Sequence, residues 1–431
     1  MSAASIVVLI VIVAVIVIGS ILKINYGLLG IVAAFICGVF IVGMSASAVL
    51  NTWSTKLFFQ MFSITFFYAF AINNGTLEKL AKKLVYATRN AKFLTPCILF
   101  VICGVIAGIG PGTISTFLIM TPIVMQVAKE SGMKPGLAAV ALACGTNAGG
   151  WSPLASNGIT LRGIMESSGY EAELAVSYGG TLFRNMLIGS IIFFIIAYVI
   201  YRGWKCKAIE GGEKPEPFDS KQRMSMILIV IFTILVVLPP VCKSIFGGKF
   251  FSSAAKMLDA TFLAVTFGLL SILLKAGDEK KAIAGVPWKT IIMVCGMGML
   301  VSVAAEAGTM DYLSEYVGRT FSAGALPYVM GIVAAVMSLF SSTMGVVVPT
   351  LYPIIFAVCS LSGANPAILF SIVPLAATSA GNSPLSLFGG LVQASLEDDT
   401  ARNRMFLELI VIAVVMTLVS LLLVAIGVVN Y

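Results

Sequence analysis

The sequence predicts an all-α polytopic membrane protein with an inverted-topology repeat, and three observations support this fold class. Hydrophobic residues make up 59% of the chain and charged residues only 11%, whereas a globular protein has about 25% charged residues. Long apolar runs recur, for example Ile6–Ile21, Met186–Tyr201 and Leu407–Val429, and each approaches the roughly 20 residues that a helix needs to span a bilayer. Two polar, helix-breaking stretches also recur in opposite halves of the chain.

The first apolar run is predicted to be a transmembrane helix whose N-terminus lies outside the cell. It is not typical of a signal peptide, because its only nearby basic residue, Lys23, follows the run. The run is also longer than the roughly 7–15-residue core of a signal peptide.

Later apolar runs predict about ten transmembrane helices in all. They lie near residues 5–22, 25–44, 57–75, 136–160 and 181–202 in the first half, and near 224–242, 258–275, 288–306, 366–391 and 405–428 in the second.

Two more apolar segments, 95–127 and 325–360, are interrupted in the middle by Gly, Ser and Thr. Each arm has only about 16 residues, which is short for a full span. We therefore expect two re-entrant helical hairpins there. The polar segment 203–222 is predicted to link a first repeat, residues 1–202, to a second repeat, residues 223–431.

The interruptions in the two halves are versions of each other. The first half reads Gly112-Thr113-Ile114-Ser115, then Thr146-Asn147-Ala148-Gly149-Gly150-Trp151-Ser152-Pro153-Leu154; the second reads Ser342-Thr343-Met344-Gly345, then Thr378-Ser379-Ala380-Gly381-Asn382-Ser383-Pro384-Leu385. Their offsets are 230 and 231 residues, and residues 73–78 match 306–311 at an offset of 233. The constant offset predicts a duplication, with broken helices at 136–160 and 366–391. Paired breaks of this kind mark the binding site of secondary transporters.

The distribution of Lys and Arg residues predicts how the protein is oriented in the cell inner (cytoplasmic) membrane. Each half crosses five times, so the second half is inverted and both termini lie outside. This orientation puts 20 of the 27 Lys and Arg residues on the cytoplasmic side, in agreement with the positive-inside rule. The first hairpin then enters from the cytoplasm and the second from outside.

The remaining composition excludes several classes of function. The net charge is +8, but the basic residues flank apolar runs and do not alternate with aromatic residues, so no nucleic-acid partner is expected. The eight cysteines form no CxxC pair, and we expect no disulfide framework. The chain has no histidine, which removes His-based catalysis and most zinc or haem sites. No cofactor is expected.

The polar breaks can bind an anion. Ser is a preferred N-cap and Pro is favoured at the first helical position, so each Ser-Pro pair predicts the start of a half-helix. Four half-helix N-termini, each carrying roughly +0.5 charge, suit a dianion. The predicted substrate-binding residues are Gly112, Thr113, Ser115, Asn147, Ser152, Pro153, Ser342, Thr343, Ser379, Asn382, Ser383 and Pro384. The alternative is close helix packing through small residues, although the duplicated order favours a site.

A coupling ion, Na⁺ or H⁺, is expected beside the substrate. Broken helices expose carbonyl oxygens that can bind Na⁺, and the predicted ion-binding residues are Gly112, Ala148, Gly149, Ser342, Ala380 and Gly381. For H⁺, the candidates are Glu306 and Glu408, because burial raises the pKa of a carboxyl group. Arg162 and Arg184 lie near the predicted outer surface.

At these residues the chain resembles the ion transporter superfamily, and within it dicarboxylate carriers of the malonate-carrier type, related to divalent anion–sodium symporters. Those symporters carry Ser-Asn-Thr at each hairpin tip and Thr-Pro in each broken helix. Here the tips read Pro111-Gly112-Thr113 and Ser341-Ser342-Thr343, so the threonines match and the asparagine is missing. The resemblance implies a dicarboxylate substrate, an elevator mechanism, a homodimeric scaffold, and amphipathic helices near 76–90 and 309–320.

Other functions fit the sequence less well. Residues 131–146 also resemble the large membrane subunit of tripartite TRAP carboxylate transporters, which needs partner subunits. An intramembrane enzyme would need a Ser–His or paired-carboxylate site, which this sequence does not offer. A channel is not favoured by duplicated hairpins. The expected partners are therefore a small dicarboxylate, membrane lipid and a second copy of the chain.

The orientation can be tested at the predicted linker. A Lys214→Cys variant should resist an impermeant maleimide on intact cells and react after permeabilisation, because residues 203–222 are predicted to be cytoplasmic. Labelling is measured against the unmodified chain, whose native cysteines set the background. Equal labelling before and after permeabilisation would reverse the topology and exchange the sides of the two hairpins.

Overall fold

The structure is a computed structural model that describes residues 3–22, 24–87, 89–208, 214–246, 253, 257–340, 343–396 and 398–430. Helices joined by turns make up this described part, which contains no strand. Six of its helices are long and apolar enough to cross a membrane. The predicted fold class, an all-α polytopic membrane protein, is confirmed.

The described residues of the first half form ten α-helices. Their bounds are α1 Ala3–Leu22, α2 Tyr26–Phe35, α3 Ala46–Asn51, α4 Thr55–Asn73, α5 Thr76–Ala87, α6 Thr95–Gly108, α7 Gly112–Ser131, α8 Pro135–Gly150, α9 Ser156–Ser167 and α10 Ala172–Ile200; a π-helical turn, η1 Ile36–Val42, continues α2, and short 3₁₀ turns are η2 Lys92–Leu94 and η3 Gly203–Lys205.

The second half repeats this order in its described residues. Its helices are α11 Ser220–Phe246, α13 Ala260–Leu273, α14 Glu279–Ala284, α15 Trp288–Glu306, α16 Thr309–Thr320, α17 Leu326–Phe340, α18 Val348–Ser362, α19 Pro366–Ala380, α20 Leu387–Ala394 and α21 Asp399–Ala425, with a π-helical turn, η4 Thr343–Val347, before α18.

Some helix bounds differ from the sequence-based expectation. Helix α10 begins at Ala172, nine residues before the predicted start at 181, and α7 has 20 residues instead of about 16. Both extensions add polar residues, such as Glu173 in α10 and Lys129 in α7, because hydropathy marks the apolar part of a helix and not its polar ends. The short helices α3 and α14 were not predicted.

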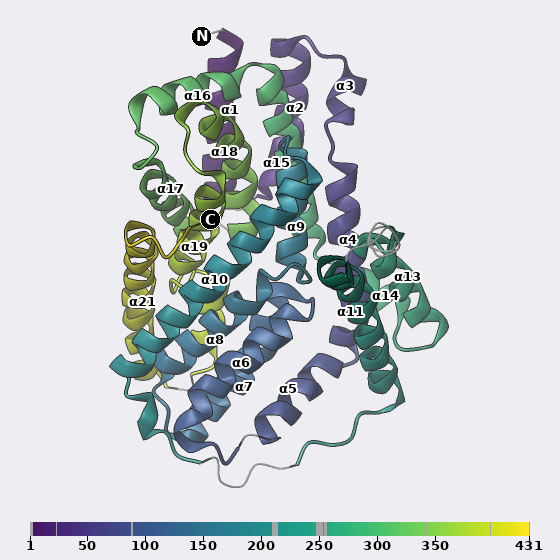
Figure 1. The fold of residues 1–431 in the computed structure, drawn as a ribbon, viewed down its shortest axis with the longest axis vertical. Helices are drawn as coiled ribbons and strands as arrows, with labels where there is room; N and C mark the ends of the chain where they lie inside the picture. Colours follow the sequence, from purple (N-terminus) through teal and green to yellow (C-terminus); the bar gives the residue numbers. More distant parts are fainter. Residues whose placement is uncertain are drawn as a thin grey trace.

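Contacts between helices come in corresponding pairs. Helix α2 packs on α15 as α13 packs on α4, α7 packs on α20 as α18 packs on α9, and α10 packs on α19 as α21 packs on α8. In each pair of contacts, the second contact is made by the repeat counterparts of the two helices that make the first. Figure 1 shows the inversion directly: α5, α6 and α7 lie toward one end of the molecule, and their counterparts α16, α17 and α18 lie toward the other.

Close approach of α6 and α8 depends on glycine. Gly104 and Gly108 on α6 face Gly145 and Gly149 on α8, and a Cβ on Gly149 would overlap the Gly104 carbonyl oxygen. Both helices thus carry small residues four apart, the spacing that lets membrane helices approach closely. This contact brings the end of α6, which leads to the hairpin tip, beside the end of α8, which leads to the break.

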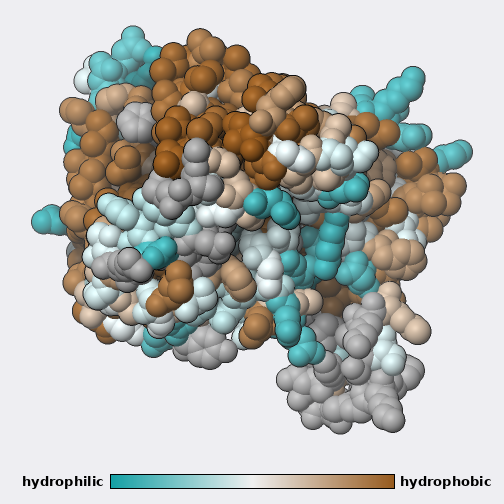
Figure 2. Space-filling view, turned by 90° about the horizontal axis from the view of Figure 1, so that it is seen from above, coloured by the Kyte–Doolittle hydropathy of each residue, from teal (hydrophilic) through white to brown (hydrophobic). Residues whose placement is uncertain are grey.

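Three hydrophobic cores follow the same symmetry. One small core joins α1 and α2 to α15 through residues such as Val8, Ala34 and Leu300. Another joins α11 and α13 to α4 through residues such as Phe232 and Phe67. A third, larger core contains most of the hairpins and broken helices. Seen from the α16 end, hydrophobic residues gather along much of the edge, and pale and teal residues occupy the centre (Figure 2).

The glycine contact between α6 and α8 predicts a stability difference between two alanine variants. Gly149→Ala should lower the melting temperature of the purified protein, because a methyl group forced into a packed site costs about 1–3 kcal/mol. Gly180→Ala on α10 is the matched control, since its Cβ would meet no atom within 4 Å and Ala is the better helix former by up to about 1 kcal/mol. Equal melting temperatures for the two variants would contradict this packing.

Candidate functional site

The first hairpin tip and the first break satisfy each other's polar groups. The tip is the turn at residues 109–111 between α6 and α7, and the break is the turn at residues 151–155 between α8 and α9. The Ser156 N–H donates to the Gly110 carbonyl oxygen at 3.0 Å, and Ser152 Oγ donates to the Gly108 carbonyl oxygen at 3.2 Å. Tyr68 from α4 donates its hydroxyl proton to the Ile109 carbonyl oxygen.

Gly112 and Thr113 begin α7 at this junction. Gly112 has φ +74°, and a Cβ there would overlap Ser156 Oγ, so the position requires glycine. The Thr113 hydroxyl oxygen accepts a hydrogen bond from Asn157 Nδ2 at 3.0 Å, and both side chains are buried. Sequence reasoning missed Asn157; the only signal was its place in the polar run Ser156-Asn157-Gly158 after the break.

The two Ser-Pro pairs do not start half-helices, which corrects the capping prediction. Helix α9 begins at Ser156 and α20 at Leu387, three to four residues later than expected. Ser152 Oγ accepts from the Ala155 N–H at 3.2 Å, as an N-cap would, but it also bonds Gly108 on another helix, and the turn ends before α9. In the second break the cap is Ser386, whose Oγ accepts from the Gly389 N–H at 3.0 Å.

The second hairpin tip is described from Thr343 onward, so Ser341 and Ser342 lie outside the described residues. Thr343 Oγ1 and Ser338 Oγ are hydrogen-bonded at 3.1 Å. A Cβ on Gly381, in the second break, would lie 3.4 Å from Ser338 Oγ. The second tip therefore lies beside the second break, as in the first half. Ser383 Oγ is buried there with no hydrogen-bond partner among the described residues.

Other predicted substrate-binding residues point elsewhere. Ser379 Oγ bonds Ser420 Oγ at 3.0 Å and Asn382 Nδ2 bonds Met416 Sδ at 3.3 Å, so both face α21. Asn147 accepts from Trp151 Nε1 at 3.4 Å. The remaining three are partly buried Ser115 on α7, exposed Pro153 in the first break, and buried Pro384, whose carbonyl oxygen accepts from Gln393.

The predicted ion-binding positions are mostly engaged within the protein. Gly149 packs on Gly104, and its carbonyl oxygen accepts from the Ser152 N–H at 2.9 Å. The Ala380 carbonyl oxygen accepts from the Ser383 N–H at 3.1 Å, and the Gly381 N–H donates to Ala377. Ala148 is buried in the last turn of α8.

The charged candidates lie away from the tips and breaks. Glu306 is exposed, and Glu408 lies 3.8 Å from Arg404 on α21. Arg184 binds Asn430 near the end of the described chain. Arg162 lies 3.8 Å from Glu166, which also pairs with Lys56 of α4 at 2.6 Å.

The tips and breaks themselves contain no charged residue in their described parts, 107–116, 146–160, 343–350 and 378–390. An anion bound there would meet hydroxyl groups, N–H groups and the positive end of a helix dipole, and no Lys or Arg side chain of these segments.

The hairpin of each repeat contacts the broken helix of the other. Phe117 of α7 packs on Phe388 of α20 with ring centroids 5.0 Å apart, and α18 packs on α9. Asn185 Nδ2 of α10 donates to Ser371 Oγ of α19 at 2.9 Å. These contacts join the two halves of the candidate site into one packed unit.

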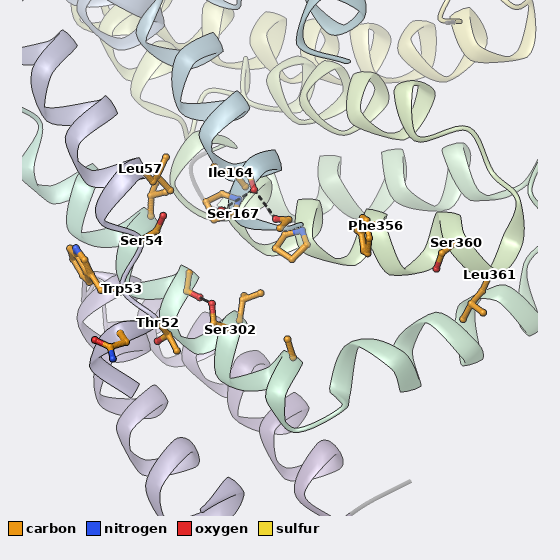
Figure 3. Close-up of a pocket in the computed structure, with 18 of the residues that line it drawn as sticks. Thr52, Trp53, Ser54, Leu57, Ile164, Ser167, Ser302, Phe356, Ser360 and Leu361 are labelled. Atoms are coloured by element: carbon orange, nitrogen blue, oxygen red, sulfur yellow. Dashed lines mark hydrogen bonds between the residues drawn. The ribbon is translucent and has the colours of Figure 1, made fainter. Parts of the chain in front are cut away.

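A cavity of about 980 Å³ lies next to this unit. Residues of α3, α4 and α15 line part of it, and residues of α9, α16 and α18 line much of the rest. Figure 3 shows Phe356 and Ser360 of α18 along one side, with Ser302 of α15 opposite. Hydroxyl groups are frequent, and Glu315 is the one charged residue among the described residues of the lining. The cavity does not include the predicted site residues.

Two family models match the chain. The model described as the N-terminus of the dicarboxylate carrier protein MatC matches residues 1–150, and the citrate transporter model matches residues 245–430. No protein with a curated description matches.

The solved structure of the YdaH transporter from Alcanivorax borkumensis, described as having an unusual topology, is similar in fold. The TM-score is 0.63 at 12% sequence identity, over 89% of this chain and 87% of that one. The chain therefore shares its fold with a solved transporter, and its two halves match family models of a dicarboxylate carrier and a citrate transporter.

Proposed function

We propose that this protein is a secondary active transporter of small dicarboxylates, of the malonate and C4-dicarboxylate class, that is coupled to a cation and works by an elevator-type movement. The matches to family models of a dicarboxylate carrier and a citrate transporter support the general function. The observation that carries the proposal at residue level is the hydrogen bond between Asn157 and Thr113 at the first tip.

This hydrogen bond determines the direction in which the Thr113 hydroxyl group can donate its proton. A hydroxyl group has one proton to donate and two lone pairs to accept. Asn157 Nδ2 occupies an acceptor position of Thr113 Oγ1, so the hydroxyl proton is left to point toward an anion. Thr113 also lies in the first turn of α7, where unpaired N–H groups and the helix dipole favour negative charge.

The absence of charged residues from the described tips and breaks suits a carrier that must release its substrate. Hydrogen bonds to a charged group contribute about 1.5–3 kcal/mol each, while burying an ion costs several kcal/mol. The two contributions nearly cancel, so a co-bound cation can decide whether the dicarboxylate stays bound.

The elevator movement is supported by two small hydrophobic cores that pack helices outside the hairpins, while α4 and α15 also contact the larger core through residues such as Met61 and Cys295. The two small cores contain α1, α2 and α15, and α11, α13 and α4, which we assign to the scaffold. The hairpins and broken helices would move as one unit against this scaffold. The 980 Å³ cavity lies between scaffold helices and this unit, and we assign it as the route to the site from the α16 end.

Substitutions at the two tip threonines should weaken substrate binding. Thr113→Val and Thr343→Val each remove a hydroxyl donor, so the KM for dicarboxylate uptake should rise by roughly 10- to 150-fold, the equivalent of one hydrogen bond to a charged group. Asn157→Asp should abolish uptake, because a carboxylate would accept the Thr113 proton and repel the substrate.

Thr116→Val is the matched control on the same helix. Its buried hydroxyl donates to the Gly112 carbonyl oxygen at 2.7 Å within α7, so its loss should leave KM nearly unchanged. Uptake close to that of the unmodified protein in both tip variants would rule out this site.

The coupling ion can be identified with the chain alone in proteoliposomes. We expect uptake of radiolabelled dicarboxylate to require an imposed sodium gradient or an imposed pH gradient. Strict sodium dependence would place the ion on backbone oxygens, since the described site contains no carboxylate. Uptake driven by pH without sodium would instead require a titrating carboxyl group or a protonated substrate.

Failure of the isolated chain to transport under either gradient would contradict the proposal of a self-sufficient carrier. It would favour a transporter that needs partner subunits.

A further inference from the structure

A second cavity lies at the opposite end of the molecule from α16. It has a volume of about 420 Å³ and lies between α5, α7 and residues 214–216 of the segment that links the two halves. In Figure 1, α5 lies near the lower end of the molecule and α16 near the upper end. The proposed transport site does not include any residue of this cavity.

Four cations line this cavity, and two of them already have carboxylate partners. Lys82 pairs with Glu78 at 2.6 Å, and Lys79 pairs with Glu216 at 3.6 Å. Arg89 lies over the ring of Tyr86 at 4.1 Å, and among the described residues no ion pair is recorded for it or for Lys214.

Among the described residues, the cluster has an excess of one positive charge. Its lining includes one further carboxylate, Glu130, which accepts a hydrogen bond from Gln126 at 2.6 Å. The four cations therefore face three carboxylates when Glu78 is included. A group with a single negative charge would neutralise the cluster, and a phosphodiester carries that charge.

The rest of the lining is apolar. Val85, Ile123 and Val127 form part of the wall, and Ile123 lies seven residues before Glu130 on α7. At 1.5 Å per residue the cavity extends about 10 Å along α7, from the charged end of the helix into its apolar part. A free phosphate ion would use only the cations, whereas a phospholipid would use both the cations and the apolar wall.

We propose that this cavity binds an anionic phospholipid. Its phosphate would lie between Arg89 and Lys214, and an acyl chain would lie against Ile123 and Val127. A zwitterionic lipid would bring an ammonium group into a cluster that already has excess positive charge, so a lipid with net negative charge is favoured.

The bound lipid would hold α5 in place. Helix α5 follows α4 directly and packs on α6 and α7, so it connects the proposed scaffold to the first hairpin. The linking segment is attached to the same helix, because Lys79 Nζ donates to the Pro217 carbonyl oxygen at 3.3 Å and Lys83 lies over the ring of Phe218 at 5.1 Å.

The test compares lipids on the purified full-length protein in detergent. Native mass spectrometry with phosphatidylglycerol, phosphatidylcholine or inorganic phosphate should show retention of phosphatidylglycerol alone. The double variant Arg89→Gln/Lys214→Gln should bind it about 25-fold more weakly, at roughly fivefold per charge near a membrane surface.

Lys207→Gln/Lys280→Gln is the matched control, because it removes the same charge from exposed positions outside the cavity. Equal phosphatidylglycerol binding by the two double variants would overturn the proposal, as would equal retention of phosphatidylcholine by the unmodified protein. Retention of inorganic phosphate would assign the site to a free anion instead. This binding assay does not depend on transport, so its outcome is separate from that of the uptake experiments.

Discussion

Backbone groups that are left unpaired inside a membrane must find partners within the protein, and this requirement shapes both halves of the molecule. Interrupting a helix in hydrocarbon exposes N–H and carbonyl groups that lipid cannot satisfy. The first repeat meets this requirement by placing two interruptions side by side. The Ser156 N–H bonds the Gly110 carbonyl oxygen, and Ser152 Oγ bonds that of Gly108. Each interruption would be costly alone, and together they form a polar, preorganised junction.

The junction depends in turn on how closely the helices that carry it approach. Gly104 and Gly149 are in contact through the backbone, so the ends of α6 and α8 meet at a distance that a hydrogen bond can bridge. A similar close contact between glycines occurs where Gly27 of α2 meets Gly296 of α15. The small residues thus serve as packing surfaces, and this role is compatible with the prediction that some of them also belong to a binding site.

The sequence predicted the fold class and the start of α7 at Gly112, because hydropathy and helix-breaking residues act locally. It did not predict the starts of α9 and α20. The N-cap rule considers only neighbours in sequence, whereas Ser152 bonds Gly108, 44 residues away. Asn157 was missed for the same reason, since its partner Thr113 is also 44 residues distant. The division into residues 1–202 and 223–431 and the ion-binding residues remain predictions.

The two repeats are alike in order but unequal in chemistry at their tips. Asn157 orients the Thr113 hydroxyl in the first repeat, while Phe388 occupies the corresponding position, 231 residues later, in the second. There, Thr343 pairs with Ser338, and either hydroxyl can donate. An amide NH2 group can only donate to its partner, whereas a pair of hydroxyls can reverse donor and acceptor by rotation. The two carboxylates of a bound dicarboxylate would therefore meet one fixed donor and one adjustable donor, which would bind one end firmly and let the other adapt to substrates of different length.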